Sequence, residues 1–318
     1  MDQEALCRDR ALGSLVGLAV GDAVGTTVEF LPRGSFPRLT DMIGAGPFRL
    51  QAGQWTDDTS MALCLAESLI SDRNLNEHDL MSRFDRWVSE GYNSSTGSCF
   101  DIGQTTLRAI AQFKRTGEPI CGSRMARDSG NGSVMRLAPV AISWWRNTYE
   151  AEQVARRQSA TTHGSPECLD GSALLARALC RGIRGDGVVS ILNDDEQWLP
   201  SIRDIGTGTW RGRPEPEISS TGYVVHTLEA AFWAFEQSTN FEDAMITAVN
   251  LGHDSDTIGA VVGQIAGSIW GLSSIPKKWV ERLYDSGRIQ QLAETLYEAG
   301  FDLRSAFSEA QILGGGRA

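Results

Sequence analysis

Two sets of glycines, each spaced four residues apart, constrain the fold of this chain more than any other feature. A glycine inside a helix costs roughly 0.5–1 kcal/mol relative to alanine, so four of them cost about 2–4 kcal/mol. Positions four apart share one helix face, where missing side chains let a second backbone approach closely. The sequence therefore predicts two tightly packed helices, one carrying Gly13, Gly17, Gly21 and Gly25, and the other Gly259, Gly263, Gly267 and Gly271.

Acidic residues stand at the ends of these two predicted helices. Asp22 and Glu29 lie at the end of the first glycine series, and Asp254 and Asp256 come just before the second. Close packing of the two helices would bring these polar ends near one another. We therefore expect a cluster of carboxylates where they meet.

The rest of the chain follows the helical period. Apolar residues recur mostly at intervals of three and four, without a convincing alternation of period two. Asn76, for example, is a typical N-cap ahead of a segment in which Leu80, Phe84 and Trp87 share a face. The stretch 187–192 could be a strand, but one strand makes no sheet. We predict an all-α protein with a single domain over residues 1–318, a loop excursion at 193–222 and a frayed tail at 313–318.

Charge and composition narrow the classes of function. Acidic residues outnumber basic ones 40 to 29, giving a net charge of −11, which disfavours an unaided nucleic-acid binder. The six cysteines form no CxxC pair, and the N-terminus lacks the basic region of a secretory signal, so we expect a reduced, cytoplasmic location. The uncharged stretch 257–276 is long enough to span a membrane, but its serines, glutamine and glycines favour a buried core helix. We expect no membrane association and favour a monomer.

Two short acidic motifs each precede or open a predicted helix, TDDT at 56–59 and DSDT at 254–257. Acids and hydroxyls cap free N–H groups at helix starts, and capping would explain either motif alone. Together they offer four carboxylates and threonine hydroxyls, the hard oxygen ligands that Mg²⁺ or Mn²⁺ prefers. Four uncompensated carboxylates in one pocket would repel strongly, and two divalent cations would neutralise them.

With these motifs the sequence resembles the ADP-ribosylglycohydrolase family. The matching segments, in family order, are GLAVGDAVGTTVEF (17–30), WTDDTSMA (55–62), CFDIGQTT (99–106), SGNGSVMRLAPVA (129–141), TTHGSP (161–166), STGYVVHTLEAAFWAF (220–235) and LGHDSDTIGAVVG (251–263). The resemblance implies a compact orthogonal bundle of helices with a dinuclear Mg²⁺ or Mn²⁺ centre. Its metal ligands would be Thr56, Asp57, Asp58, Asp254, Asp256 and Thr257.

The resemblance also implies residues that hold ADP-ribose. Small residues ahead of an apolar helical run leave backbone N–H groups free to meet an anion, and the family assigns such a turn to the diphosphate. His163 matches a position near the diphosphate, and Tyr223 could stack or hydrogen-bond near the adenosine. An ordinary turn, a loop histidine and a core tyrosine are the structural alternatives. The predicted diphosphate turn consists of Ser129, Gly130, Asn131, Gly132 and Ser133.

Three further acidic residues have possible roles in the site. Glu29 matches a family position over the metal centre, or is a surface residue at a helix end. Asp101 matches the substrate side of the cleft, where a carboxylate could pair with an arginine guanidinium, or it caps a loop. Asp22 either supports the metal ligands or is a structural hydrogen-bond acceptor.

The implied activity is hydrolysis of ADP-ribosyl bonds on protein side chains, with arginine favoured and ADP-ribose as product. The bond cleaved would join ribose C1″ to a side-chain nitrogen. Two metals about 3.5–4 Å apart could hold the ribose hydroxyls and orient a water. Asp57 or Asp58 is the expected base, with Glu29 or Asp101 as alternatives.

Other functions stay open from the sequence. One is hydrolysis of another ADP-ribose conjugate, such as ADP-ribosyl-serine, O-acetyl-ADP-ribose or a modified nucleic-acid base. A catalytically silent relative is another, although it would not need six ligands. His253 beside Asp254 would fit an HD phosphohydrolase, but the chain offers no fitting companion histidines upstream.

Overall fold

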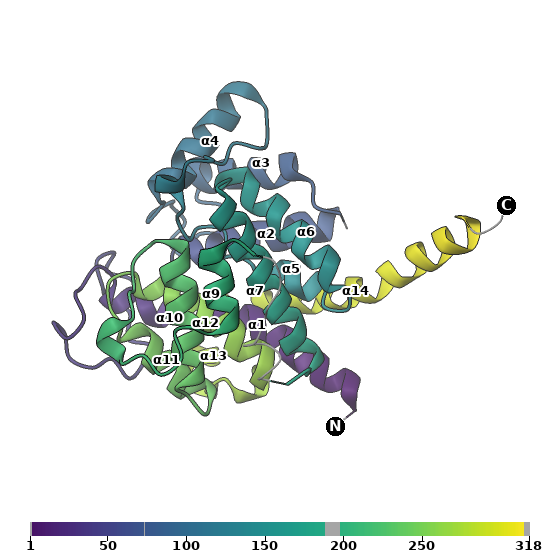
Figure 1. Cartoon of the computed structure of the whole chain (residues 1–318). Coiled ribbons are helices and arrows are strands. Elements are labelled where there is room, and N and C mark those ends of the chain that lie inside the picture. The colour runs from purple at the N-terminus through teal and green to yellow at the C-terminus, as the bar shows by residue number, and fades with distance from the viewer. Residues whose placement is uncertain (1, 73, 188–197, 315–318) are drawn as a thin grey trace.

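The computed structural model describes residues 2–72, 74–187 and 198–314, with side chains up to residue 301. The described residues form helices joined by turns and contain no strand, so the all-α prediction is confirmed (Figure 1). The helices are α1 (Gln3–Gly25), α2 (Asp57–Ser71), α3 (Glu77–Glu90), α4 (Gln104–Thr116), α5 (Ala138–Ser143), α6 (Thr148–Thr162), α7 (Pro166–Arg184), α9 (Pro200–Thr207), α10 (Val224–Glu236), α11 (Phe241–Val249), α12 (Ser255–Trp270), α13 (Lys277–Arg282) and α14 (Ser286–Gly314).

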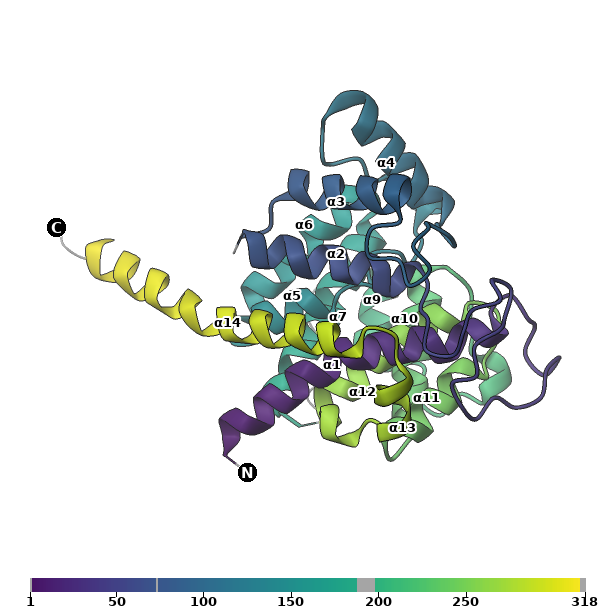
Figure 2. The same cartoon turned by 180° about the vertical axis from the view of Figure 1, so that it is seen from behind.

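Helices α1 and α12 pack against each other through their glycine faces at the centre of the protein (Figure 2). A Cβ atom built on Gly17 would lie under 3.0 Å from the carbonyl oxygen of Gly263, and one on Gly263 equally close to that of Gly17. The hydroxyl of Ser255 donates across the same interface to the carbonyl of Gly25, at 2.9 Å. The predicted close approach of the two glycine faces is confirmed.

Helix α1 is also apolar enough to cross a membrane. The segment Gln3–Val28 contains an 18-residue window with a mean hydropathy of 1.5, and 94% of that window is buried inside the protein. Burial of this kind is typical of the core helix of a soluble protein. The uncharged stretch considered in the sequence was 257–276, and its first part belongs to α12. Residues 255–268 of this helix are buried, which confirms the predicted core helix.

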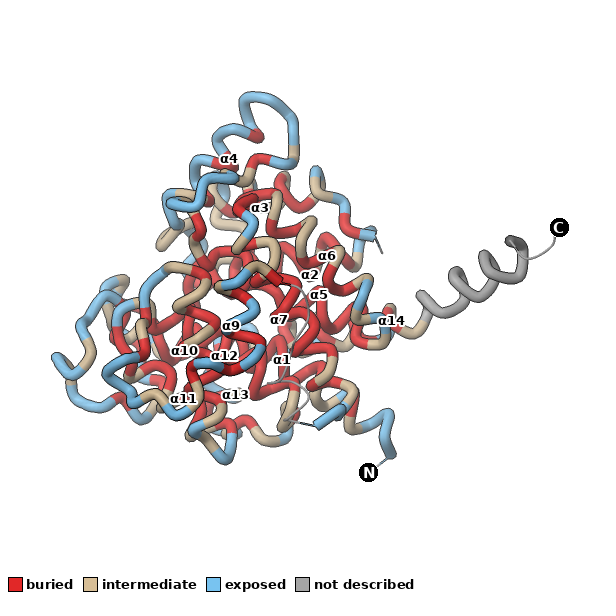
Figure 3. The backbone as a smooth tube through the Cα atoms, viewed as in Figure 1, coloured by how far each residue is buried: buried red, intermediate tan, exposed pale blue. Residues whose placement is uncertain are grey.

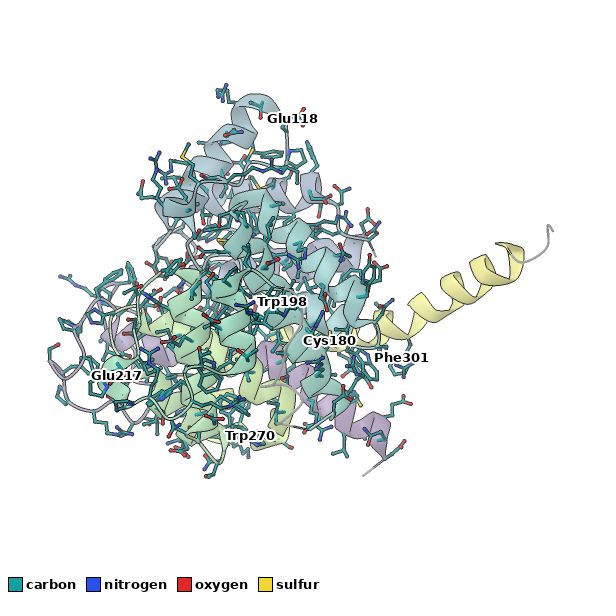
Figure 4. The ribbon with its side chains drawn as sticks, in the orientation of Figure 1. Glu118, Cys180, Trp198, Glu217, Trp270 and Phe301 are labelled. Carbon is teal, nitrogen blue, oxygen red and sulfur yellow. The ribbon has the colours of Figure 1, made fainter. Side chains whose placement is uncertain are left out.

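Other helices cover both sides of the central pair. Helices α7, α10 and α11 pack against α12, whereas α2, α5 and α14 pack against α1. Helices α3, α4 and α6 contact one another farther out, and α4 is largely exposed (Figure 3). Glu118, which follows α4, lies at the tip of the molecule, and Phe301 lies where α14 leaves the body (Figure 4). Asn76 caps α3 by accepting a hydrogen bond from the amide of Asp79, as predicted.

The segment 193–222 differs from the predicted loop. Residues 193–197 lie outside the described residues, as does most of the possible strand at 187–192. Helix α9 begins at Pro200, where a first-turn proline fits, and it buries Ile202 and Ile205. The indole of Trp210 is buried and donates to the carbonyl of Ile205 at 2.9 Å. The loop prediction is therefore wrong for 200–207, because the helix is too short to show a clear period in the sequence.

The predicted frayed tail at 313–318 is also only partly described. Helix α14 continues to Gly314, and residues 315–318 lie outside the described residues.

Candidate active site

Asp22 fixes the start of α2. This fully buried carboxylate accepts hydrogen bonds from the amide and hydroxyl of Thr56, both at 2.9 Å, and from those of Thr59, at 3.0 and 2.6 Å. Burial raises the pKa of Asp22 to about 6, and these four hydrogen bonds oppose that rise. Asp22 is thus a structural acceptor that positions the first turn of α2, which carries Asp57 and Asp58.

The first turns of α2 and α12 bring the predicted carboxylates together. One oxygen from each of Asp57, Asp58 and Asp256 lies within 4.8 Å of the others. A second group with the same spacing consists of Glu29, Asp101 and Asp256. Asp256 belongs to both groups, so its carboxylate lies between them. Glu29 and Asp101, predicted as catalytic residues, are therefore also placed where they could bind a metal.

The chemistry of this cluster fits a divalent cation. Buried oxygens of Glu29, Asp58 and Asp256 have no hydrogen-bond partner within the described part of the chain. Burial, reinforced by neighbouring carboxylates, raises the pKa of Glu29 to about 10 and that of Asp101 to about 7. Burial and the neighbouring carboxylates likewise raise the pKa values of Asp58 and Asp256 well above the usual range. Cations would pair with the free oxygens and relieve the repulsion.

Asp254 and Thr257 complete the set of predicted ligands. Asp254 is the N-cap residue of α12, and one of its oxygens accepts a 2.6 Å hydrogen bond from the side-chain amide of Asn131. Thr257 lies in the first turn of the same helix. Thr56 Oγ1 lies 3.4 Å from Asp256 Oδ2, which links the N-cap of α2 to the cluster. All six predicted ligands therefore gather in one place, although Asp254 is in neither group of closely spaced carboxylates.

The backbone is strained around the carboxylates. Phe30, Asp101 and His253 adopt left-handed conformations, with φ of 64°, 60° and 58°. Such a conformation costs a non-glycine residue roughly 1–3 kcal/mol and persists where the surroundings enforce it. Here the amide of Phe30 donates to the carbonyl of His253 at 2.7 Å, and the amide of His253 donates to the carbonyl of Leu31 at 2.8 Å. These two hydrogen bonds join the segment after α1 to the segment before α12.

A cavity of about 570 Å³ lies over the cluster, a volume within the range of small-molecule sites. Its lining combines acidic groups with small polar residues and a few apolar side chains. The lining includes Glu29, Phe30, Phe48, Asp57, Asp101, Gly130, Asn131, Gly132, His163, Asp254, Asp256 and Thr257.

Only the three central residues of the turn at 129–133 line the cavity. Residues 130–132 line it, whereas the hydroxyl of Ser129 donates to Ser165 at 2.8 Å and that of Ser133 accepts from Ser172 at 3.1 Å. The serines thus anchor the turn to α7 and its N-cap. The sequence placed this turn at a helix N-terminus, which is wrong because α5 begins only at Ala138.

His163 and Tyr223 are placed differently from each other. His163 is buried and lines the cavity, and burial, with a smaller contribution from Arg136, lowers its pKa to about 3. Tyr223 is absent from the cavity lining, and its hydroxyl donates to Glu167 at 2.7 Å. The structure therefore places Tyr223 in a packing position.

Sequence reasoning missed an aromatic row beside the acidic residues. Phe30 and Phe48 meet edge to face with ring centroids 6.2 Å apart, and Phe48 and Phe100 are 5.1 Å apart. Phe30 is 62% exposed, although it lines the cavity. The only signal in the sequence was that Phe30 follows Glu29 and Phe100 precedes Asp101. Phe48 carried no signal because it lies in an aperiodic loop.

Comparison with known proteins identifies the family of this fold and site. The sequence matches the ADP-ribosylglycohydrolase family over residues 3–305, and the chain belongs to that family. It is an ADP-ribosylglycohydrolase, as the sequence resemblance implied, and the family hydrolyses ADP-ribose conjugates.

The chain is similar to several named relatives. It is 43% identical to ADP-ribosylarginine hydrolase Tri1 of Serratia proteamaculans, over 91% of this chain and 79% of that protein. It is 31% identical to ADP-ribosyl-[dinitrogen reductase] glycohydrolase of Rhodospirillum rubrum, over 86% of this chain and 90% of that protein. A solved structure titled ADP-ribosylglycohydrolase-related protein complex superposes with a TM-score of 0.84 at 40% identity, covering 93% of this chain and 99% of the other.

Proposed function

We propose that this protein removes ADP-ribose from ADP-ribosylated arginine side chains of proteins, with two divalent cations, Mg²⁺ or Mn²⁺, as cofactors. The observation that carries the proposal is the pair of carboxylate clusters, each of three residues, that share Asp256. They lie beside a cavity large enough for a nucleotide sugar. The choice of arginine is supported by the name of the Serratia relative, an ADP-ribosylarginine hydrolase.

One cation would be held between Asp57, Asp58 and Asp256, and the other between Glu29 and Asp256. Bound there, the cations would supply Lewis acidity toward the ribose hydroxyls and the attacking water. The residues that would hold them share oxygen donors and lie at the first turns of α2 and α12 or beside them. They are Thr56, Asp57, Asp58, Asp254, Asp256 and Thr257, together with Glu29, and Asp101 is left for the substrate.

Hydrolysis adds a hydroxyl to C1″ and returns a proton to the departing guanidine. Positive charge develops on the sugar as the bond breaks, as in other glycoside hydrolysis, and the surrounding carboxylates would stabilise it. Of the two expected bases, Asp57 lines the cavity, whereas Asp58 is fully buried and does not. We therefore assign to Asp57 the removal of the proton from the water.

The two ends of the substrate would contact different residues. The turn at 130–132 and His163 lie together in the lining and offer neutral polar groups to the diphosphate. Asp101 lines the cavity beside Glu29 and Asp256, where its carboxylate could pair with the guanidinium of the modified arginine. The six cysteines are free thiols, which supports a reducing compartment such as the cytoplasm. Acting there on protein substrates and not on a membrane is part of the proposal.

A panel of matched peptides tests this function. Peptides carrying ADP-ribose on arginine, serine or aspartate are incubated with the protein and Mg²⁺ or Mn²⁺, and released ADP-ribose is measured. We expect the arginine-linked peptide to be hydrolysed fastest. A chelator should abolish turnover, and added metal should restore it. Metal should also raise the melting temperature, since a ligand at 100 times its Kd stabilises the folded state by about 2.7 kcal/mol.

Two outcomes of the panel would contradict separate parts of the proposal. Faster hydrolysis of the serine-linked peptide would overturn the choice of arginine but not the hydrolase. Unchanged turnover in a preparation verified to be free of metal would overturn the role of the cations.

Replacing Asp101 with asparagine should separate recognition of arginine from recognition of ADP-ribose. A hydrogen bond to a charged group contributes about 1.5–3 kcal/mol, so KM for the arginine-linked peptide should rise roughly 10–150-fold. The affinity for free ADP-ribose, measured by calorimetric titration, should stay near that of the parent. Equal losses for both ligands would assign Asp101 to the sugar or the metal instead.

A further inference from the structure

Arg136 is a fully buried arginine next to the cavity wall. Its Nε donates to the side-chain oxygen of Gln158 at 2.9 Å, and its Nη2 donates to the carbonyl of Gln158 and the hydroxyl of Thr162, both at 3.0 Å. The guanidinium also lies over the ring of Phe84, 4.7 Å from the centroid. Arg136 does not line the cavity, and the proposed reaction makes no use of it.

The hydrogen bonds of Arg136 determine which nitrogen of His163 carries a proton. A guanidinium only donates, so Thr162 Oγ1 must accept from Arg136. The hydroxyl retains one proton, and His163 Nδ1 lies 2.9 Å from it. Among the described residues, no other acceptor lies within hydrogen-bond distance of that hydroxyl. The hydroxyl therefore donates to Nδ1, and a neutral imidazole that accepts at Nδ1 carries its proton on Nε2.

The protonated Nε2 faces the turn that lines the cavity. A Cβ atom built on Gly132 would lie 3.0 Å from Nε2, and one built on Gly130 would lie 3.3 Å from it. No hydrogen bond from Nε2 to a described residue exists, although His163 is only 3% exposed. The N–H of Nε2 is therefore available to a ligand in the cavity.

We propose that Arg136 and Thr162 are positioning residues that lock His163 in its Nε2–H tautomer, so that the ring presents a neutral donor to a diphosphate oxygen of the ligand. The diphosphate as recipient rests on the proposed function, whereas the tautomer rests on the hydrogen bonds alone. Burial lowers the pKa of His163 to about 3, so the ring stays neutral and the donor does not depend on pH between 5 and 8.

NMR of the intact protein with ¹⁵N-labelled histidine tests the tautomer directly. The chain has four histidines, and a His163→Gln variant identifies the signals of His163. We expect an unprotonated Nδ1 and a protonated Nε2, without titration from pH 5 to 8. A protonated Nδ1, or an equal mixture of tautomers, would overturn the proposal without bearing on the hydrolase activity.

Substitutions at Thr162 test the consequence for binding. Thr162→Val removes the hydroxyl, while Arg136 keeps both of its hydrogen bonds to Gln158. The single-tautomer pattern should be lost, and the Kd for ADP-ribose should rise about 10-fold, the equivalent of one neutral hydrogen bond. Thr162→Ser should restore both. Affinity for plain ribose should not change, because ribose has no phosphate.

Thr161 provides a matched control. Its hydroxyl lies 3.5 Å from Nη2 of Arg136 and donates to the carbonyl of Gln158, and it is as buried as that of Thr162. Thr161→Val should therefore leave the His163 signals and the Kd for ADP-ribose at parent values. Equal weakening by Thr161→Val and Thr162→Val would show a general packing effect and overturn the relay.

His163→Ala separates failure of the relay from failure of the ligand assignment. Removing a donor to a charged diphosphate should raise the Kd for ADP-ribose roughly 10–150-fold. Parent affinity in this variant would overturn the diphosphate contact, even if the NMR tautomer is as expected.

Discussion

Asp256→Asn is expected to lower kcat/KM for an ADP-ribosylarginine peptide by more than about 100-fold. Substituting a residue that only supports a metal ligand already lowers metal affinity or activity about 10–100-fold. Asp256 itself belongs to both carboxylate clusters. The variant should also bind Mn²⁺ more weakly in a calorimetric titration. Steady-state kinetics at saturating Mg²⁺ separate a lost ligand from a weakened one, because excess metal restores only the latter.

The fold of this variant should survive. Burial raises the pKa of Asp256, so the folded metal-free parent loses stability as pH rises above the usual aspartate range near 4. Asparagine removes that cost, and the metal-free variant should be at least as stable as the parent at pH 7, with the difference shrinking below pH 4. Asp204→Asn on the exposed side of α9 is the matched control and should be fully active. Parent kinetics in Asp256→Asn would refute the ligand assignment.

Gly263→Ala should destabilise the protein severely, although alanine favours helices. The added methyl group would lie under 3.0 Å from the carbonyl of Gly17, on a backbone that cannot rotate away. Overpacking costs about 1–3 kcal/mol and occasionally more, which exceeds the 0.5–1 kcal/mol gained in helix propensity. Urea unfolding followed by circular dichroism should show a lower midpoint. Activity should fall as well, because separating α1 from α12 moves Asp256 away from Asp58.

Gly287→Ala is the matched control for this prediction. Gly287 is exposed in α14, and no atom lies within 4 Å of a Cβ built on it. Here only helix propensity changes, so the free energy of unfolding should rise by about 0.5–1 kcal/mol. If both substitutions changed the free energy of unfolding in the same direction, the glycines of α12 would not be needed for close packing against α1.

The centre of the fold could be predicted from the sequence because its signals are periodic. The glycine series gave the pairing of α1 and α12, and the acids at their ends gave the carboxylate cluster. Asn76 gave the start of α3 through a local hydrogen bond. Helix α9 could not be predicted, since eight residues hold little more than two turns and its burial depends on distant helices.

Much of the detail around the cluster depends on contacts that no local pattern records. The turn at 129–133 looked like a helix start, and only the structure shows that its serines bond to α7 and its N-cap. Asp101 was assigned to the substrate, and only the structure shows that its backbone is left-handed and that its carboxylate lies beside Glu29 and Asp256. Arg136 carried no signal at all, because a lone arginine in an apolar run resembles a surface residue.

The pairing of α1 with α12 also fixes the order of events during synthesis. Gly25 and Ser255, which touch in the finished protein, are 230 residues apart, and a ribosome adding about 5–20 residues per second needs roughly 12–46 s to make that length. Throughout this interval the apolar surface of α1 has no α12 to cover it. The nascent chain is then most exposed to aggregation and to chaperones, and the proposed cation centre can form only after the last carboxylates have emerged.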